Sequence, residues 1–206
     1  MLNYRLISFH VCLFSLLLCW SCTRTINAKI DSINLPTPQL EPLPIMVGVY
    51  YGDYLLTYKT SQTYQDPGGQ TFVYNVEFGK ANIALFDYIT SGLFREVKHF
   101  SRLPFGSWTM GNIDLIIEPT VDHYSPWFPV DLEYKVKFYL PSGKIIIWPI
   151  KGTSQEQLTS FMDQIISTNN LIKHTQFAMR DFAAKFMVGF CKHYELKNFF
   201  SDQCGQ

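Results

Sequence analysis

The stretch LEYKVKFYLPSGKIIIWPI (residues 132–150) decides the fold. Two runs rich in β-branched and aromatic residues flank a Pro-Ser-Gly turn, so the sequence predicts an antiparallel hairpin. Two further strands are predicted at VGVYY (47–51) and IDLIIEPTVDHY (113–124). In the second of these, Pro119 indicates an edge position or a bulge near the end of the strand. We expect the four segments to form one sheet.

The segments around this sheet predict one more hairpin and three helices. SQTYQDPGGQ (61–70) carries turn residues between two β-rich runs, which predicts a long hairpin. The segment 80–97 predicts a helix, because it has an apolar stripe of Leu85, Phe86, Ile89, Leu93 and Val97. Helices are also predicted at 155–168, where Ser154 and Gln157 form a capping-box pattern, and at 173–193. The expected fold is α+β, a mostly antiparallel sheet with helices packed chiefly on one face.

The amino-terminal segment has the features of a secretory signal. LISFHVCLFSLLLCW (6–20) follows a single basic residue, Arg5, and is shorter than the about 20 apolar residues that span a bilayer. Ser21 before Cys22 resembles the lipobox of bacterial lipoproteins, although Cys19 and Trp20 depart from that pattern. The resemblance implies that Cys22 is lipidated and the peptide before it removed. Thr23 follows Cys22 at the position where an inner-membrane retention signal would have Asp. The resemblance therefore implies that the lipid anchors the protein in the outer membrane, facing the periplasm.

Two other interpretations of this segment stay open: an uncleaved membrane anchor, and an ordinary signal peptide cut near Ala28. Residues 23–46 contain four prolines, and we interpret them as an extended tether. The expected organisation is a signal peptide over 1–21, the lipidated cysteine and Pro-rich tether over 22–46, one α+β domain over 47–194, and a carboxy-terminal tail over 195–206.

Charge and cysteine content restrict the function. The chain has 17 Lys and Arg against 17 Asp and Glu, without a basic cluster, which argues against nucleic acid or an anionic lipid surface as a partner. Apart from Cys22, the mature chain keeps Cys191 and Cys204. In an oxidising periplasm these two residues either form a disulfide or are a core cysteine and a tail cysteine. Without paired histidines nearby they lack the ligands for zinc, so no metal or cofactor is expected.

The order of predicted elements resembles the small domain of several envelope lipoproteins. A strand at VGVYY, a helix at ALFDYITSGLF, a strand at IDLIIEPTVDHY, the hairpin YKVKFYLPSGKIIIW and a closing helix at AMRDFAAKFMVGF carry this resemblance over about residues 45–192. Similar domains occur in the curli secretion lipoprotein, the outer-membrane activators of penicillin-binding proteins and the amino-terminal domain of the Tol translocation protein. The chain departs from them in a long insertion before the first helix and in two carboxy-terminal helices. The resemblance implies a binding or assembly module without catalytic residues.

The sequence contains no recognised catalytic motif such as G-x-S-x-G, H-E-x-x-H, a Walker loop or G-x-G-x-x-G. The best remaining set is Asp114, Glu118 and Asp122, which a strand would place on one face, followed by His123. Such a row can bind a cation or support acid–base chemistry, but it is more often the solvated side of a half-buried strand. We therefore expect that the protein is not an enzyme.

The aromatic loop HYSPWFPV (123–130) is the strongest candidate for binding a partner. Tyr124, Trp127 and Phe128 lie in a connection expected on the surface, and exposed aromatic residues often anchor protein interfaces. The alternative is that these rings fold back and cap one end of the core. Trp108, in FGSWTMG (105–111), forms a second and weaker patch.

Together these features predict a periplasmic lipoprotein that is anchored in the outer membrane and serves as a non-catalytic accessory or structural subunit of a secretion, transport or wall-assembly machine. Its partners would be other cell-envelope proteins, and its contact with the membrane would be made through the lipid. The alternative is a carrier that holds a lipid or another apolar ligand between the sheet and the carboxy-terminal helices. A carrier predicts an apolar cavity there, whereas an adaptor predicts a filled core.

Overall fold

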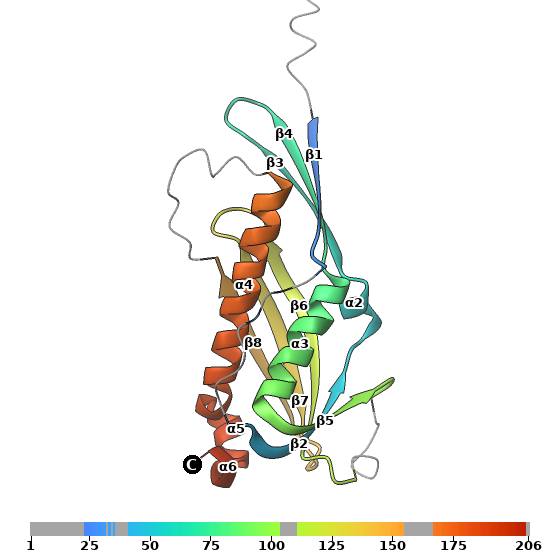
Figure 1. The fold of residues 1–206 in the computed structure, drawn as a ribbon, viewed down its shortest axis with the longest axis vertical. Helices are drawn as coiled ribbons and strands as arrows, with labels where there is room; N and C mark the ends of the chain where they lie inside the picture. Colours follow the sequence, from blue (N-terminus) through green and yellow to red (C-terminus); the bar gives the residue numbers. More distant parts are fainter. Residues whose placement is uncertain are drawn as a thin grey trace, which may run out of the picture.

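The computed structural model describes residues 23–31, 33, 35, 41–103, 111–154 and 167–204. Within these residues the larger sheet contains β2 (Leu43–Tyr50), β5 (Phe94–Phe100), β6 (Leu115–Ser125), β7 (Asp131–Tyr139) and β8 (Ile145–Thr153), in the order β5-β2-β6-β7-β8. The smaller sheet contains β1 (Thr23–Lys29), β3 (Lys59–Gln65) and β4 (Thr71–Glu77), in the order β1-β4-β3. It extends the molecule at one end of its long axis (Figure 1).

The two long helices, α3 (Gly79–Leu93) and α4 (Thr168–Gly189), cover one face of the five-stranded sheet (Figure 1). A short helix, α2 (Asp53–Leu56), follows β2. The chain ends in a 3-10 turn, η4 (Phe190–Lys192), and two short helices, α5 (Tyr194–Phe199) and α6 (Ser201–Cys204). β3–β4, β6–β7 and β7–β8 pair antiparallel, while β1–β4 and the pairs made by β2 are parallel. The predicted α+β class, with helices on one face of the sheet, is confirmed.

The β7–β8 hairpin forms as predicted, around a three-residue turn. The Gly143 N–H donates to the Leu140 carbonyl at 2.9 Å, and the Leu140 N–H donates to the Lys144 carbonyl at 2.9 Å. Gly143 has a φ of 82°, a conformation that favours glycine, and a turn ending in such a residue is common in three-residue hairpins. The hairpin therefore fixes which side chains of both strands face the helices.

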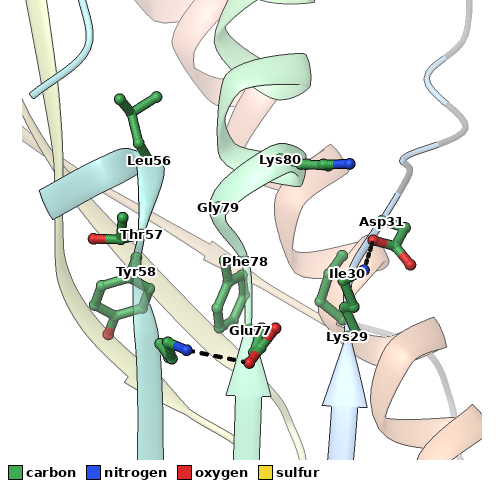
Figure 2. Close-up of a pocket in the computed structure, with 11 residues that line it drawn as sticks. Lys29, Ile30, Asp31, Leu56, Thr57, Tyr58, Glu77, Phe78, Gly79 and Lys80 are labelled. Carbon is green, nitrogen blue, oxygen red and sulfur yellow. Dashed lines mark hydrogen bonds and ion pairs between the residues drawn. The ribbon is translucent and has the colours of Figure 1, made fainter. Parts of the chain in front are cut away.

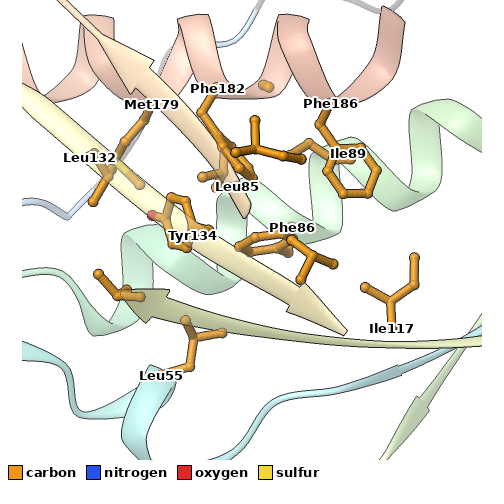
Figure 3. Close-up of a cluster of buried hydrophobic side chains, with 14 of the residues drawn as sticks. Leu55, Leu85, Phe86, Ile89, Ile117, Leu132, Tyr134, Met179, Phe182 and Phe186 are labelled. Carbon is orange, nitrogen blue, oxygen red and sulfur yellow. The ribbon is translucent and has the colours of Figure 1, made fainter. Parts of the chain in front are cut away.

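The core lies between this sheet and the two long helices (Figure 3). Its centre is built from aromatic rings: Phe182 of α4 lies 4.5 Å from Tyr134 of β7 and 5.5 Å from Phe86 of α3, measured between ring centroids. The buried Tyr134 hydroxyl donates to the Asn82 amide oxygen at 2.6 Å, and the Asn82 amide nitrogen donates to the Leu55 carbonyl at 3.4 Å, so the buried polar atoms have partners. Gly152 permits the close approach of α4, since a Cβ there would lie 2.0 Å from the Ala178 carbonyl oxygen.

The prediction for Pro119 is also confirmed. β2 pairs with β6 only from Leu115 to Ile117, so Pro119 lies just beyond this pairing, where β6 has a neighbour on one side only. The register of β6 against β7 then shifts between Val121 and His123. A residue without an N–H is tolerated here because no ladder bond is lost.

The predicted tether over residues 23–46 is wrong for its first part. Thr23–Lys29 form β1, which pairs in parallel with β4, and Ile26, Ala28 and Ile30 are buried in the core. These apolar residues alternate with polar ones, which is the pattern of a half-buried strand. The folded domain therefore includes β1, and β2 begins at Leu43 rather than at residue 47.

Two other boundaries differ from the predictions. The helix predicted over 80–97 ends at Leu93, and Phe94–Phe100 form β5, so Val97 belongs to a strand. The predicted tail over 195–206 contains α5 and α6, with Leu196 and Phe200 buried. A disulfide between Cys191 and Cys204 closes this segment, which decides between the two alternatives for these cysteines. Cys22, Trp108 and most of the helix predicted at 155–168 lie outside the described residues.

Replacing Phe182 by Ala is expected to lower the free energy of unfolding by about 3–5 kcal/mol, because the ring fills the centre of the core. The matched control is Val188→Ala on the same helix, where the side chain is 55% exposed and the expected change is within about 0.5 kcal/mol. Urea unfolding followed by circular dichroism measures both. Equal losses for the two variants would contradict the packing described here.

Candidate functional site

The acidic row lies on the outer face of the five-stranded sheet, the face opposite α3 and α4, and its carboxylates are already engaged. Glu118 accepts hydrogen bonds from the Lys137 ammonium at 3.3 Å and from the Tyr139 hydroxyl. Asp122 forms an ion pair with Lys135. Asp114 accepts the Met46 N–H at 2.9 Å. The row is a series of cross-strand pairs on an open face and does not converge in a cleft.

No group of three or more His, Cys, Asp or Glu side chains in the described part of the chain is arranged to hold a metal ion. His123 is exposed. His99 lies 3.7 Å from Asp87, which accepts a hydrogen bond from the Tyr51 hydroxyl at 2.6 Å. Burial and the neighbouring Asp87 both raise the pKa of Tyr51, so its phenol stays protonated as a donor. These three side chains join α3 to β5 and to the end of β2, which is a structural role.

The aromatic loop folds back onto the body, so the prediction that Tyr124 is exposed is wrong. Tyr124 is only 2% exposed, its ring meets Phe78 edge-on at 4.8 Å, and its hydroxyl lies 2.9 Å from the Thr175 hydroxyl. Burial raises the pKa of Tyr124, which keeps this hydroxyl protonated. Tyr124 therefore joins β6 to α4 and cannot anchor a partner.

Trp127 and Phe128 are half-buried rather than free. The Trp127 ring lies 5.0 Å from Tyr64 and 5.1 Å from Tyr74, on the two strands of the β3–β4 hairpin. Phe128 meets His174 of α4 at 5.2 Å. The loop thus caps the end of the core where the two sheets meet, which was the alternative interpretation of this segment.

A pocket of about 260 Å³ opens where β1, β3 and β4 meet the start of α3 (Figure 2). Ile30, Tyr58 and Phe78 contribute apolar lining. Two ion pairs border it, with Lys29 at 3.0 Å from Asp31 and Lys59 at 3.4 Å from Glu77, and Lys80 also lines it. We assign this pocket no function.

The space between the sheet and α4 contains packed side chains (Figure 3). Leu132, Tyr134 and Phe138 of β7 are fully buried against Phe182 and Phe186 of α4. A hollow of about 630 Å³ lies between α3 and α4, and it is lined by Leu35, Tyr88, Arg180, Asp181, Ala183, Ala184 and Met187. None of these lining residues belongs to the sheet. The space between β7 and α4 is filled at these residues.

The outer face carries an apolar row that the sequence analysis did not identify. Ile145 of β8 pairs with Tyr139 of β7, which pairs with Ile116 of β6, so these side chains form a line across three strands. Ile145 is 52% exposed and Ile147, two residues along the same face of β8, is 55% exposed. The signal was present in KIIIWPI, because three successive isoleucines in a strand cannot all face the same side.

No protein-family model matches the chain, and no curated protein matches it significantly. No helix in the described part of the chain has both the length and the apolar character needed to cross a membrane.

Replacing Tyr124 by Phe is expected to lower the free energy of unfolding by about 1 kcal/mol, because the buried Thr175 hydroxyl loses its partner. The matched control is Tyr194→Phe, which removes a hydroxyl from a side chain that is 77% exposed and should change nothing measurable. Urea unfolding compares the two variants. If Tyr124→Phe behaved like the control, the buried hydrogen bond would not stabilise the loop.

Proposed function

We propose that this protein is a non-catalytic accessory subunit of a cell-envelope assembly, anchored in the outer membrane by a lipid on Cys22 and facing the periplasm. The position of β1 supports cleavage directly before Cys22 rather than near Ala28. β1 begins at Thr23, directly after Cys22, and pairs with β4 over its whole length. A signal peptide cut near Ala28 would remove most of this strand and expose the apolar side of β4, whereas a cut before Cys22 leaves the fold intact.

The Cys191–Cys204 disulfide supports an oxidising compartment. Such bonds persist in the periplasm and in secreted proteins and are rare where thiols are kept reduced. The bond closes the segment from η4 to α6, which packs under the end of α4 through Leu196 and Phe200. The disulfide is therefore consistent with the periplasm, which is the compartment that we propose from the amino-terminal signal.

The observation that carries the proposal of a binding role is the pair of exposed isoleucines, Ile145 and Ile147, on the outer face of β8. The β6 end of the same face is covered, since Ile116 is buried against Phe100 and Leu103. Large aliphatic side chains that are more than half exposed on a rigid sheet are suited to burial against another protein. The β7–β8 turn, beside which Ile145 lies, is at the opposite end of the long axis from the start of β1 (Figure 1). A lipid next to β1 would thus leave this apolar row at the end of the domain farthest from the membrane, where a periplasmic partner can reach it.

Replacing Cys22 by Ser is expected to abolish fatty-acid labelling of the chain and to release it from the membrane fraction, because oxygen does not substitute for sulfur in the lipid linkage. The matched control is Cys19→Ser, which changes a cysteine that lacks a small residue before it. Metabolic labelling with palmitate, followed by membrane fractionation, measures both. Unchanged labelling of Cys22→Ser would contradict the anchor.

Replacing Ile147 by Lys is expected to reduce at least tenfold the envelope proteins that are recovered with the chain after mild crosslinking, since a charge would be placed in the centre of the interface. The matched control is Tyr54→Lys on α2, where the side chain is 59% exposed but lies outside the outer face. Quantitative mass spectrometry of the isolated complexes compares them. Equal recovery with both variants would exclude the outer face as the docking surface.

A further inference from the structure

One edge of the five-stranded sheet has main-chain groups directed away from the sheet. Among the described residues, β8 is a terminal strand and pairs only with β7. Because the Leu140 N–H bonds the Lys144 carbonyl, the even-numbered residues of β8 direct their N–H and C=O groups toward β7. The odd-numbered residues direct theirs away from the sheet. This alternation also places the side chains of Ile145 and Ile147 on the outer face.

Part of this edge is already occupied by α4. The Thr153 N–H donates to the Asp181 carboxylate at 2.9 Å, and the Lys151 carbonyl accepts from the Lys185 ammonium at 3.0 Å. Pro149 has no N–H to offer. Among the odd-numbered residues of β8, Ile145 and Ile147 therefore keep both a donor and an acceptor on the outside of the sheet.

Two of the other three edge strands, β5 and β3, are protected against strand pairing. β5, at the far side of the same sheet, has charged or titratable side chains at Arg95, Glu96, Lys98 and His99. β3, an edge of the smaller sheet, has the polar sequence KTSQTYQ. Charged and polar residues of this kind prevent edge strands from pairing with other chains. At Ile145–Ile147 the edge carries no such residue.

We propose that β8 pairs antiparallel with β8 of a second copy of this chain, with the two-fold axis at Ile146. In this register Ile145 of the first copy is opposite Ile147 of the second. By symmetry, Ile147 of the first copy is opposite Ile145 of the second. Each pair exchanges two main-chain hydrogen bonds, so the interface makes four, and it uses the donors and acceptors that face outward in each copy. A self-complementary patch of this kind is what a two-fold dimer requires.

The neighbouring residues fit a second copy. Lys144 would lie opposite Trp148 of the other copy, so no like charges face each other. Pro149 would lie opposite Gly143, which has no side chain to obstruct the proline ring. On the face of the sheet that α4 covers, the Lys185 ammonium reaches the β8 edge. Val188 is one helical turn beyond Lys185, so it lies on the side of α4 that a second copy would approach. Its 55% exposure would be reduced there.

Pairing in this way joins the two five-stranded sheets into one continuous sheet. The outer faces of both copies then form a single surface, with four isoleucines at its centre. This inference goes beyond the proposed function and does not depend on lipidation or on the identity of any envelope partner, because it concerns only the purified chain.

The register can be tested by mixing two variants of the full chain that each carry one added cysteine, Ile145→Cys and Ile147→Cys, with different tags. The measurement is made in mild detergent with a large excess of micelles over chains. Opposed residues in such a pair have Cα atoms about 5.5 Å apart, which suits a disulfide. We expect oxidation to give mainly the mixed dimer. Each variant alone should crosslink at least tenfold less, because Ile145 is not opposite itself.

The parent chain controls for Cys22, and a mixture of Ile145→Cys with Lys151→Cys controls for random collision. A mixed dimer no more abundant than in these controls would overturn the proposal.

A second comparison tests the main-chain hydrogen bonds. Ile147→Pro and Ile147→Ala both lose the isoleucine side chain, but only Ile147→Pro loses the outward N–H. We expect dimerisation to be about 30-fold weaker in Ile147→Pro than in Ile147→Ala, because two hydrogen bonds per dimer are lost. Equal dimerisation of the two folded variants would also overturn it.

Discussion

The packing of α4 against the inner face of β7 and β8 is the constraint on which the rest of the structure depends. Tyr134 and Phe138 of β7 are buried under Phe182 and Phe186 of α4, and the tight approach at Gly152 fixes the helix over the end of the sheet. Burial of these aromatic rings stabilises the core, because each removes a large apolar area from water. Because both long helices lie on one face, the opposite face at Ile145 and Ile147, and the β8 edge beside these two residues, are left open within the described part of the chain.

Local patterns in the sequence were sufficient to predict several of the helices and strands that build the core. The β7–β8 hairpin and most of the stripe on α3 were predictable because alternation and helical spacing are properties of neighbouring residues. β1 and β5 were missed because each forms by pairing with a distant parallel strand, as in the register of Thr23 with Thr71. The alternation at Ile26, Ala28 and Ile30 is a short local signal, and the strand is completed by pairing with β4, which is remote in sequence.

The candidate site was harder to predict than the fold, for a related reason. Tyr124 and Ile145 both occupy strands, and nothing in the local sequence says that the tyrosine is covered by α4 while the isoleucine is left open. Composition favoured the aromatic loop, but those rings were needed to close the junction between the two sheets. The isoleucines are exposed because the helices occupy only the opposite face. Burial, rather than residue type, therefore decides which apolar side chains are available to a partner.

β8 uses one side of its main chain for hydrogen bonds within the fold and presents the other side to a partner. Residue-resolved amide hydrogen exchange of the dilute protein distinguishes the two sides. We expect slow exchange for the amides of Ile146 and Trp148, which face β7, and fast exchange for those of Ile145 and Ile147. Slow exchange of all four amides in the dilute protein, or fast exchange of Ile146 and Trp148, would contradict it.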